Sequence, residues 1–260
     1  MIKEYFNIAL FQPDLVWESP ALNLSKVDQL LDQLPKGTDV VFLPEMFTTG
    51  FTMNVSQYAE PADGETIRWM KKRSRDHQVA LCGSLIMKEA GLYFNRLVFV
   101  EPSGEIRLYD KRHLFTMGNE GKYFNRGAER LIVQYKGWRI CPLICYDLRF
   151  PVWSRNRNEY DLLVYVANWP QSREEVWNTL LKARALENQA YVAGVNRVGV
   201  DGQMISYSGN SQILSPKGLC LAETRSDEEA IIAAELSWSE LVKFRSTFPV
   251  LDDADTFYLE

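Results

Sequence analysis

One cysteine of this chain stands where a nucleophile would be useful. The apolar run Trp138–Ile144 predicts a buried strand, and it ends abruptly at Cys145, before polar residues and Pro151. A cysteine at the start of a helix meets the positive end of the helix dipole, which favours the thiolate. The backbone N–H of Tyr146 would point to the same place and donate to an oxyanion. Most free cysteines are small core residues, so position alone leaves packing and catalysis both open.

Two other predicted strands end in a charged residue. Glu45 comes just after the apolar residues 40–43, and Lys111 follows shortly after residues 106–109. Functional residues collect at the carboxyl ends of strands in open sheets. Separately, Glu45 is explained as well by capping a helix, and Lys111 by solvation. Together with Cys145 they form a set of side chains that could carry out catalysis.

The chain lacks the residue patterns of several other kinds of catalytic or binding site. The two histidines, His77 and His113, have no HExxH or clustered Cys/His spacing, so no metal site is expected. The segment 118–122 resembles a phosphate loop, but Tyr123 stands where Ser or Thr is required. Neither GxGxxG after a strand nor GxSxG is present. Catalysis by side chains without a cofactor or metal is what we expect.

The composition of the chain restricts the classes of partner that it is expected to bind. The 260 residues are 46% hydrophobic and 24% charged, which is typical of a globular chain. A net charge of −5 without a basic stripe argues against nucleic acid, and no apolar run is long enough to span a membrane. Four cysteines without CxxC spacing are too few for a disulfide scaffold. We therefore expect a cytoplasmic protein that acts on a small molecule.

The elements that must position these residues alternate along the whole chain. The first third predicts β-α-β-α-β, which favours a mixed sheet with helices packed on one face. No linker, repeat or change in composition divides the chain, so residues 1–260 are expected to form a single domain. After residue 248 an extended acidic tail is expected. The predicted strands are 6–11, 39–43, 79–85, 97–100, 106–109, 131–135, 138–144, 162–166, 191–195 and 231–236, and the predicted helices are 20–34, 65–75, 174–188 and 238–245.

These segments together resemble the nitrilase (carbon–nitrogen hydrolase) superfamily over nearly the whole chain. The stretches around Glu45, Lys111 and Cys145 look like its Glu, Lys and Cys signatures, and residues 184–188 match its helix after the nucleophile. Details such as residues 45–51, 167–170 and the acidic tail resemble its bacterial ω-amidases. The resemblance implies an α/β fold with two mixed sheets in an α-β-β-α sandwich, a homodimer or higher homo-oligomer, and no cofactor.

The resemblance and the chemistry imply a role for each residue. Cys145 would attack the amide, Glu45 would move the protons, and Lys111 with the Tyr146 N–H would hold the oxyanion. Glu120 lies where the family often has a second glutamate, which holds the lysine or the substrate. Arg149 is expected either to bind a substrate carboxylate or to form an internal ion pair. The candidate pocket walls, for which simple packing is the alternative, are Phe47, Met117 and Trp169.

The predicted activity is that of an ω-amidase. Its substrates would be short dicarboxylate monoamides such as 2-oxoglutaramate and 2-oxosuccinamate, hydrolysed through a cysteine thioester to the dicarboxylate and ammonia. Other amidases, carbamoyl hydrolases and nitrilases of the superfamily share the same three residues and are alternatives. From other classes, a Cys–His hydrolase pairing Cys145 with His113 and a protein that binds amides without catalysis also remain open.

Overall fold

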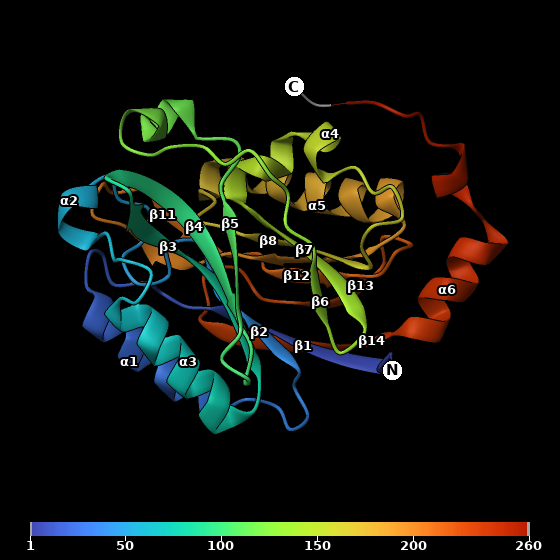
Figure 1. Cartoon of the computed structure of the whole chain (residues 1–260), viewed down its shortest axis with the longest axis horizontal. Coiled ribbons are helices and arrows are strands. Elements are labelled where there is room, and N and C mark those ends of the chain that lie inside the picture. Colours follow the sequence, from blue (N-terminus) through green and yellow to red (C-terminus); the bar gives the residue numbers. More distant parts are fainter. Residues whose placement is uncertain (1, 259–260) are drawn as a thin grey trace.

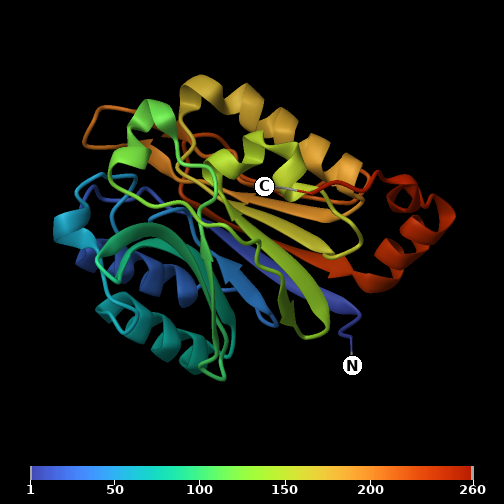
Figure 2. The same ribbon diagram turned by 45° about the horizontal axis from the view of Figure 1, so that its top comes forward.

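The computed structural model describes residues 2–258, which form two stacked six-stranded sheets and a small two-stranded ribbon. Figure 1 shows the elements and Figure 2 the stacking of the sheets. The first sheet has the order β14 (Ala230–Ser237), β1 (Tyr5–Gln12), β2 (Val40–Phe42), β3 (Ala80–Glu89), β4 (Leu92–Val100) and β5 (Ile106–Asp110). The second has the order β13 (Cys220–Glu223), β12 (Gln212–Leu214), β9 (Tyr191–Val195), β8 (Leu162–Val166), β7 (Trp138–Ile144) and β6 (Val133–Tyr135), and the ribbon pairs β10 (Val198–Val200) with β11 (Ser206–Ser208).

Both sheets are parallel at the centre and antiparallel at the edges. In the first sheet β1, β2 and β3 are parallel, and in the second β7, β8 and β9 are parallel. Strand β5 pairs antiparallel with β4, which pairs antiparallel with β3, so β5 runs in the direction of β2 and β3. The carboxyl ends of β2 and β5 therefore lie at the same edge of the first sheet.

Alternation along β1 explains how the first sheet is covered on both faces. Phe6, Ile8 and Leu10 pack in the core between the two sheets, whereas Ala9 and Phe11 pack against helices. Successive side chains of a strand point to opposite faces, so a continuous apolar run such as this one suits a strand buried on both sides. The apolar run of β1 therefore contributes side chains to two cores, one between the sheets and one between the first sheet and its helices.

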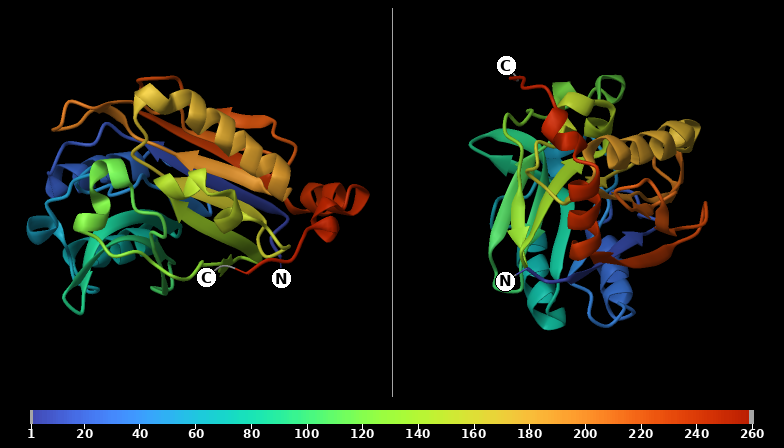
Figure 3. Two further views of the ribbon diagram at one scale, coloured as in Figure 1. Left: turned by 90° about the horizontal axis from the view of Figure 1, so that it is seen from above. Right: turned by 90° about the vertical axis from the view of Figure 1, so that its right-hand side faces the viewer.

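The helices form the outer layers, as Figures 2 and 3 show. Helices α1 (Pro20–Leu31) and α3 (Glu65–His77) contribute apolar residues to the core beside the first sheet, and α5 (Glu174–Asn188) contributes to the core of the second. Pro20 begins α1, where its missing N–H leaves no bond unmade. The shorter helices are α2 (Val55–Tyr58), α4 (Pro151–Ser154) and α6 (Trp238–Thr247). The expectation of two mixed sheets flanked by helices is confirmed.

Some boundaries differ from the sequence-based expectation. Strands β3 and β4 are longer than predicted and meet in a tight hairpin in which Ala90 and Gly91 both have positive φ, 49° and 81°. An alanine is uncommon in that conformation, so the turn gave no clear signal. Helix α1 ends at Leu31 rather than at residue 34. The segment 215–218 is also expected to form a hairpin turn, and the structure confirms it, because this turn joins the antiparallel strands β12 and β13. The ribbon β10–β11 was not predicted.

The chain after α6 turns back along the molecule toward α4 (Figure 1). The centroid of the Phe257 ring lies 5.8 Å from the guanidinium carbon of Arg157, so the segment packs on the body of the protein. The tail was expected to be extended, but Val250–Asp253 forms a 3-10 turn. Within residues 2–258, no helix is long and apolar enough to cross a membrane.

Candidate active site

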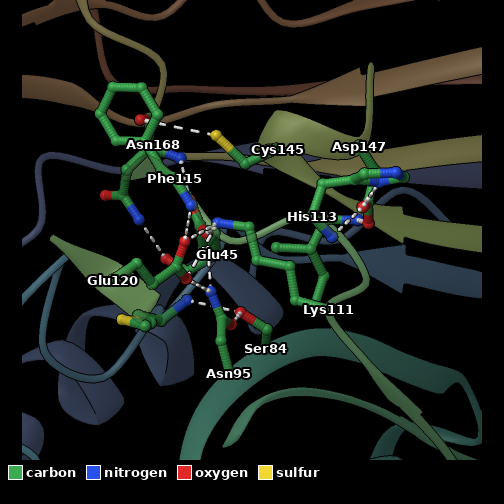
Figure 4. A network of polar contacts seen from close by, with 12 residues as sticks. Glu45, Ser84, Asn95, Lys111, His113, Phe115, Glu120, Cys145, Asp147 and Asn168 are labelled. Atoms are coloured by element: carbon green, nitrogen blue, oxygen red, sulfur yellow. Dashed lines mark hydrogen bonds and ion pairs between the residues drawn. The ribbon is translucent and has the colours of Figure 1, made fainter. Parts of the chain in front are cut away.

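Three strand ends converge on one cavity of about 330 Å³. Glu45 comes three residues after β2, Lys111 directly after β5, and Cys145 directly after β7. The first two belong to one sheet and Cys145 to the other, so the cavity lies where the two sheets meet (Figure 4). All three side chains line it, which is the juxtaposition that amide hydrolysis needs.

Lys111 is held between two carboxylates. Its Nζ lies 2.8 Å from Glu45 Oε1 and 3.0 and 2.9 Å from the two carboxylate oxygens of Glu120, and all three side chains are fully buried. Burial disfavours the ammonium, but the charges of Glu120 and Glu45 outweigh it and raise the pKa of Lys111. Lys111 is therefore a permanent cation at the cavity wall.

Glu120 holds the lysine and does not line the cavity. Its Oε2 also accepts a hydrogen bond from the Phe115 N–H at 2.6 Å. Burial raises the pKa of Glu120, the Lys111 charge opposes that rise, and the Glu45 charge adds to it. Of the two roles left open for Glu120, the geometry supports the one that positions Lys111.

A buried amide connects the two carboxylates. Asn95 Nδ2 donates to Glu45 Oε1 at 2.8 Å and to Glu120 Oε1 at 3.1 Å (Figure 4). Asn95 Oδ1 accepts from Ser84 Oγ at 2.9 Å, and Ser84 Oγ accepts from the Met46 N–H at 2.8 Å. These bonds fix which end of the amide faces the carboxylates. Sequence reasoning missed Asn95, because it lies inside β4 rather than at a strand end.

The other oxygen of Glu45 is held from the second sheet. The Asn168 N–H donates to Glu45 Oε2 at 3.0 Å, and Asn168 Nδ2 donates to the Glu45 carbonyl oxygen at 2.6 Å. Asn168 follows β8, so the strand-end rule that found Glu45 would also have found it. Both carboxylate oxygens of Glu45 are thus fixed by donors from different strands, which leaves the group little freedom to rotate.

Cys145 sits on a strained turn that is also the start of a short 3-10 helix. Its φ is 43°, and Cys145–Arg149 is a single 3-10 turn of five residues. Positive φ is uncommon for a residue other than glycine and is often found at functional sites. The sulfur lies 3.8 Å from the Asn168 carbonyl oxygen. The expected helix start is therefore present, but the helix is only five residues long, so few peptide dipoles add up at its end.

The surroundings of Cys145 disfavour its thiolate. Burial raises the pKa of the thiol well above its usual value, the Glu45 charge raises it further, and the Lys111 charge only partly opposes this. These surroundings work against the thiolate that a position at a helix start is expected to favour. The physical reason is that desolvation of the charged form outweighs the nearby cation. A base must accept the thiol proton, and Glu45 lines the same cavity.

His113 belongs to a brace beside the site. Its ring Nδ1 lies 2.8 Å from Asp147 Oδ1, and the ring stacks on Phe150 with centroids 3.7 Å apart. Asp147 also accepts from the Tyr109 hydroxyl at 2.7 Å and the Ile144 N–H at 3.0 Å, which secures the residues on either side of Cys145. His113 does not line the cavity, so the geometry does not support a Cys–His pair.

The structure places some of the predicted pocket walls at the cavity and one of them elsewhere. Trp169, Tyr146 and Met117 line the cavity, and Met117 is 78% exposed. Phe47 is fully buried in the core beside α3, 6.2 Å from Trp69 between ring centroids, so its assignment as a wall is wrong. The backbone after Glu45 turns sharply at Met46, whose φ is 44°, and the chain then directs Phe47 into the core.

Arg149 lines the cavity and is exposed. Its guanidinium carbon lies 5.3 Å from the centroid of the Trp169 ring, and within residues 2–258 it has no carboxylate partner. Of its two predicted roles, the geometry therefore favours substrate binding over an internal ion pair.

The described part of the chain holds no group of three or more His, Cys, Asp or Glu side chains placed to bind a metal ion.

Comparison with known proteins identifies close relatives. The family model described as carbon-nitrogen hydrolase matches residues 7–246. The chain is 46% identical to the omega-amidase YafV of Escherichia coli (strain K12), over 97% of this chain and 98% of that protein. It is 33% identical to the 2-oxoglutaramate amidase of Bacillus subtilis (strain 168), over 95% and 97% of the two chains. The solved structure of XC1258 from Xanthomonas campestris, a CN-hydrolase superfamily protein with an arsenic adduct in its active site, matches with a TM-score of 0.96 at 41% identity, over 99% and 100% of the chains.

Proposed function

This chain belongs to the carbon-nitrogen hydrolase family, and on that basis we propose that it is an ω-amidase. Its substrates are short dicarboxylate monoamides, 2-oxoglutaramate or 2-oxosuccinamate, and its products are the dicarboxylate and ammonia. The observation that carries the proposal is the meeting of Glu45, Lys111 and Cys145 on one cavity. The similarity to an omega-amidase and to a 2-oxoglutaramate amidase over nearly the full chain supports the choice of substrate.

In the first half of the reaction Glu45 takes the proton from Cys145, and the sulfur attacks the amide carbon. The carbonyl oxygen becomes an oxyanion, which the Lys111 ammonium and the Tyr146 N–H stabilise. When the intermediate collapses, the carbon–nitrogen bond breaks and Glu45 gives its proton to the nitrogen. Ammonia leaves, and the acyl group remains on Cys145 as a thioester.

In the second half a water molecule attacks the thioester carbon and gives a proton to Glu45. The same donors hold the second oxyanion. The carbon–sulfur bond then breaks, the carboxylic acid forms, and the proton on Glu45 returns to the Cys145 sulfur. The raised pKa of the thiol suits this cycle, because each turnover ends with the proton back on the Cys145 sulfur.

Arg149 supports the preference for a charged substrate. A guanidinium with no carboxylate partner in residues 2–258 is free to bind the far carboxylate of a monoamide. A charge-assisted bond of this kind contributes about 1.5–3 kcal/mol, or about ten- to a hundred-fold in affinity. The aromatic walls limit the length of the substrate.

Ammonia release from a panel of compounds tests the proposal. We expect kcat/KM for 2-oxoglutaramate and 2-oxosuccinamate to exceed that for butyramide, butyronitrile and a carbamoyl compound. Equal values for butyramide or the nitrile would contradict the ω-amidase assignment and leave only the family. The Cys145→Ala variant should release no ammonia, whereas Cys220→Ser, a change at an exposed cysteine, should stay active. Protein quenched during turnover should carry an acyl group on Cys145.

We also propose that the enzyme works as a homodimer or higher homo-oligomer in the cytoplasm. Apolar side chains on the outer helices support the first point: Val152 on α4 and Leu186 on α5 are about half exposed. Four free cysteines support a reducing compartment. Light scattering after size-exclusion chromatography tests the assembly, and a single protomer mass would contradict it.

A further inference from the structure

A second guanidinium lines the cavity besides that of Arg149. Arg173 belongs to the 3-10 turn Gln171–Arg173, directly before α5, and its side chain is half-buried. Like Arg149, it forms no ion pair with any residue in the range 2–258. Most other arginines that are at least partly buried face a carboxylate or carbonyl oxygen, as Arg96 does with Asp110. The positive charge of Arg173 is thus held in place without being neutralised.

Aromatic rings hold both guanidinium groups. The Arg173 guanidinium carbon lies 5.2 Å from the centroid of the Phe115 ring, and that of Arg149 lies 5.3 Å from the Trp169 ring. Trp169 connects the two, because its Nε1 donates to the Arg173 carbonyl oxygen at 2.8 Å. Stacking on a ring orients a guanidinium but leaves its N–H groups free to bind an anion.

The charges on the other walls determine where an anion can lie. At the inner end Glu45 faces the cavity, and its carboxylate would repel a second one. Asp201 lies on another wall and accepts hydrogen bonds from the Gln203 N–H at 2.8 Å, the Ile205 N–H at 3.0 Å and the Tyr207 hydroxyl at 2.8 Å. The ammonium of Lys111 also lines the cavity, but Glu45 and Glu120 already pair with it. A substrate carboxylate is therefore attracted mainly toward the wall that carries the two arginines, whose charges have no carboxylate partner in residues 2–258.

We propose that Arg173 is a substrate-binding residue that acts together with Arg149 on the carboxylate end of the ω-amide. The inference rests on the proposed ω-amidase function and deepens it, because it gives the substrate a direction in the cavity. The carboxylate lies against Arg149 and Arg173, and the terminal amide reaches Cys145 and Lys111. The two arginines then select charged monoamides over neutral amides of the same length.

Kinetics with charged and neutral amides test this role. We expect Arg173→Gln to raise KM for 2-oxoglutaramate and 2-oxosuccinamate by about tenfold or more, since a charge-assisted bond is lost. The same variant should lower the ratio of kcat/KM for the charged amides to that for butyramide by a similar factor, whereas a structural defect would lower both values and keep the ratio. Arg173→Lys should raise KM for the charged amides less than Arg173→Gln, because it keeps the charge but loses the bidentate geometry. Arg75→Gln, at an exposed arginine of α3, is the matched control.

The outcomes separate this inference from the proposed function. If the wild-type enzyme prefers the ω-amides and Arg173→Gln keeps that preference, Arg173 has no role and the ω-amidase assignment stands. If the wild-type enzyme shows no preference for the ω-amides, the proposed function fails and the role of Arg173 fails with it. Should Arg173→Gln not fold by circular dichroism, Arg173→Lys decides: an unchanged KM for the charged amides would overturn the role.

Discussion

The side-chain amide of Asn95 donates a hydrogen bond to Glu45 Oε1 at 2.8 Å, inside the core of the first sheet. Glu45 Oε1 also accepts a hydrogen bond from Lys111 Nζ, so Asn95 and Lys111 hold the same carboxylate oxygen in place. The second amide hydrogen of Asn95 goes to Glu120, which holds Lys111 from the other side. Asn95 thus positions the whole Glu45–Lys111–Glu120 cluster without facing the substrate cavity.

Replacing Asn95 should lower turnover by acting on Glu45. We expect Asn95→Asp to lower kcat by about tenfold or more, because general-base catalysis depends on the placement of the base. A third carboxyl group in this cluster adds to the raised pKa of Glu120, so the acidic limb of the kcat/KM profile should move to higher pH. The conservative control is Asn178→Asp on α5, whose side chain accepts a hydrogen bond from Gln212 and contacts neither carboxylate. A profile unchanged in pH would contradict the positioning role.

Removing the base or the cation should impair the chemical step. Glu45→Gln and Lys111→Met should each lower kcat by at least about 10², the usual size of base and oxyanion contributions. Steady-state kinetics with 2-oxoglutaramate measure this, and circular dichroism checks the fold. Loss of Lys111 leaves Glu45 and Glu120 without their shared cation, so some loss of stability is also expected. An effect of Lys111→Met on KM alone would rule out its oxyanion role.

The resting form of Cys145 is testable by spectroscopy. Because burial and the Glu45 charge raise the pKa of the thiol well above its usual value, no thiolate absorbance at 240 nm should be assigned to Cys145 at neutral pH. The difference between wild type and Cys145→Ser isolates the signal. Glu45→Gln removes a nearby negative charge, so it should lower the pKa and bring thiolate formation to lower pH. A thiolate already present in the wild type at neutral pH would contradict this account.

His113 should matter for structure more than for catalysis. Its ring contacts Asp147 and Phe150 rather than the cavity, so His113→Gln should retain most of kcat and lower the midpoint of thermal unfolding. Turnover and a melting curve measured on the same preparation decide between the two effects. A loss of turnover as large as that of Cys145→Ala would instead favour a Cys–His pair.

The sequence by itself determined the α/β architecture and the three central residues. Apolar runs alternating with amphipathic segments predict strands and helices, because burial depends on local periodicity. Glu45, Lys111 and Cys145 were identified because each is a chemically capable residue just past the end of a predicted strand. That signal is local, and it does not require knowledge of which strands are neighbours.

Only the tertiary structure decided how these residues are held and charged. Asn95 lies within a strand, and its partners Glu45 and Glu120 come from other parts of the chain, so no local pattern marks it. The direction of Phe47 and the pairing of Trp169 with Arg149 depend on turns and on sheet packing. The raised pKa of Cys145 depends on its burial and on the nearby charge of Glu45. Both arise because the second sheet, which carries Cys145, packs against the first, which carries Glu45. These properties arise from long-range contacts, and spacing along the chain does not contain them.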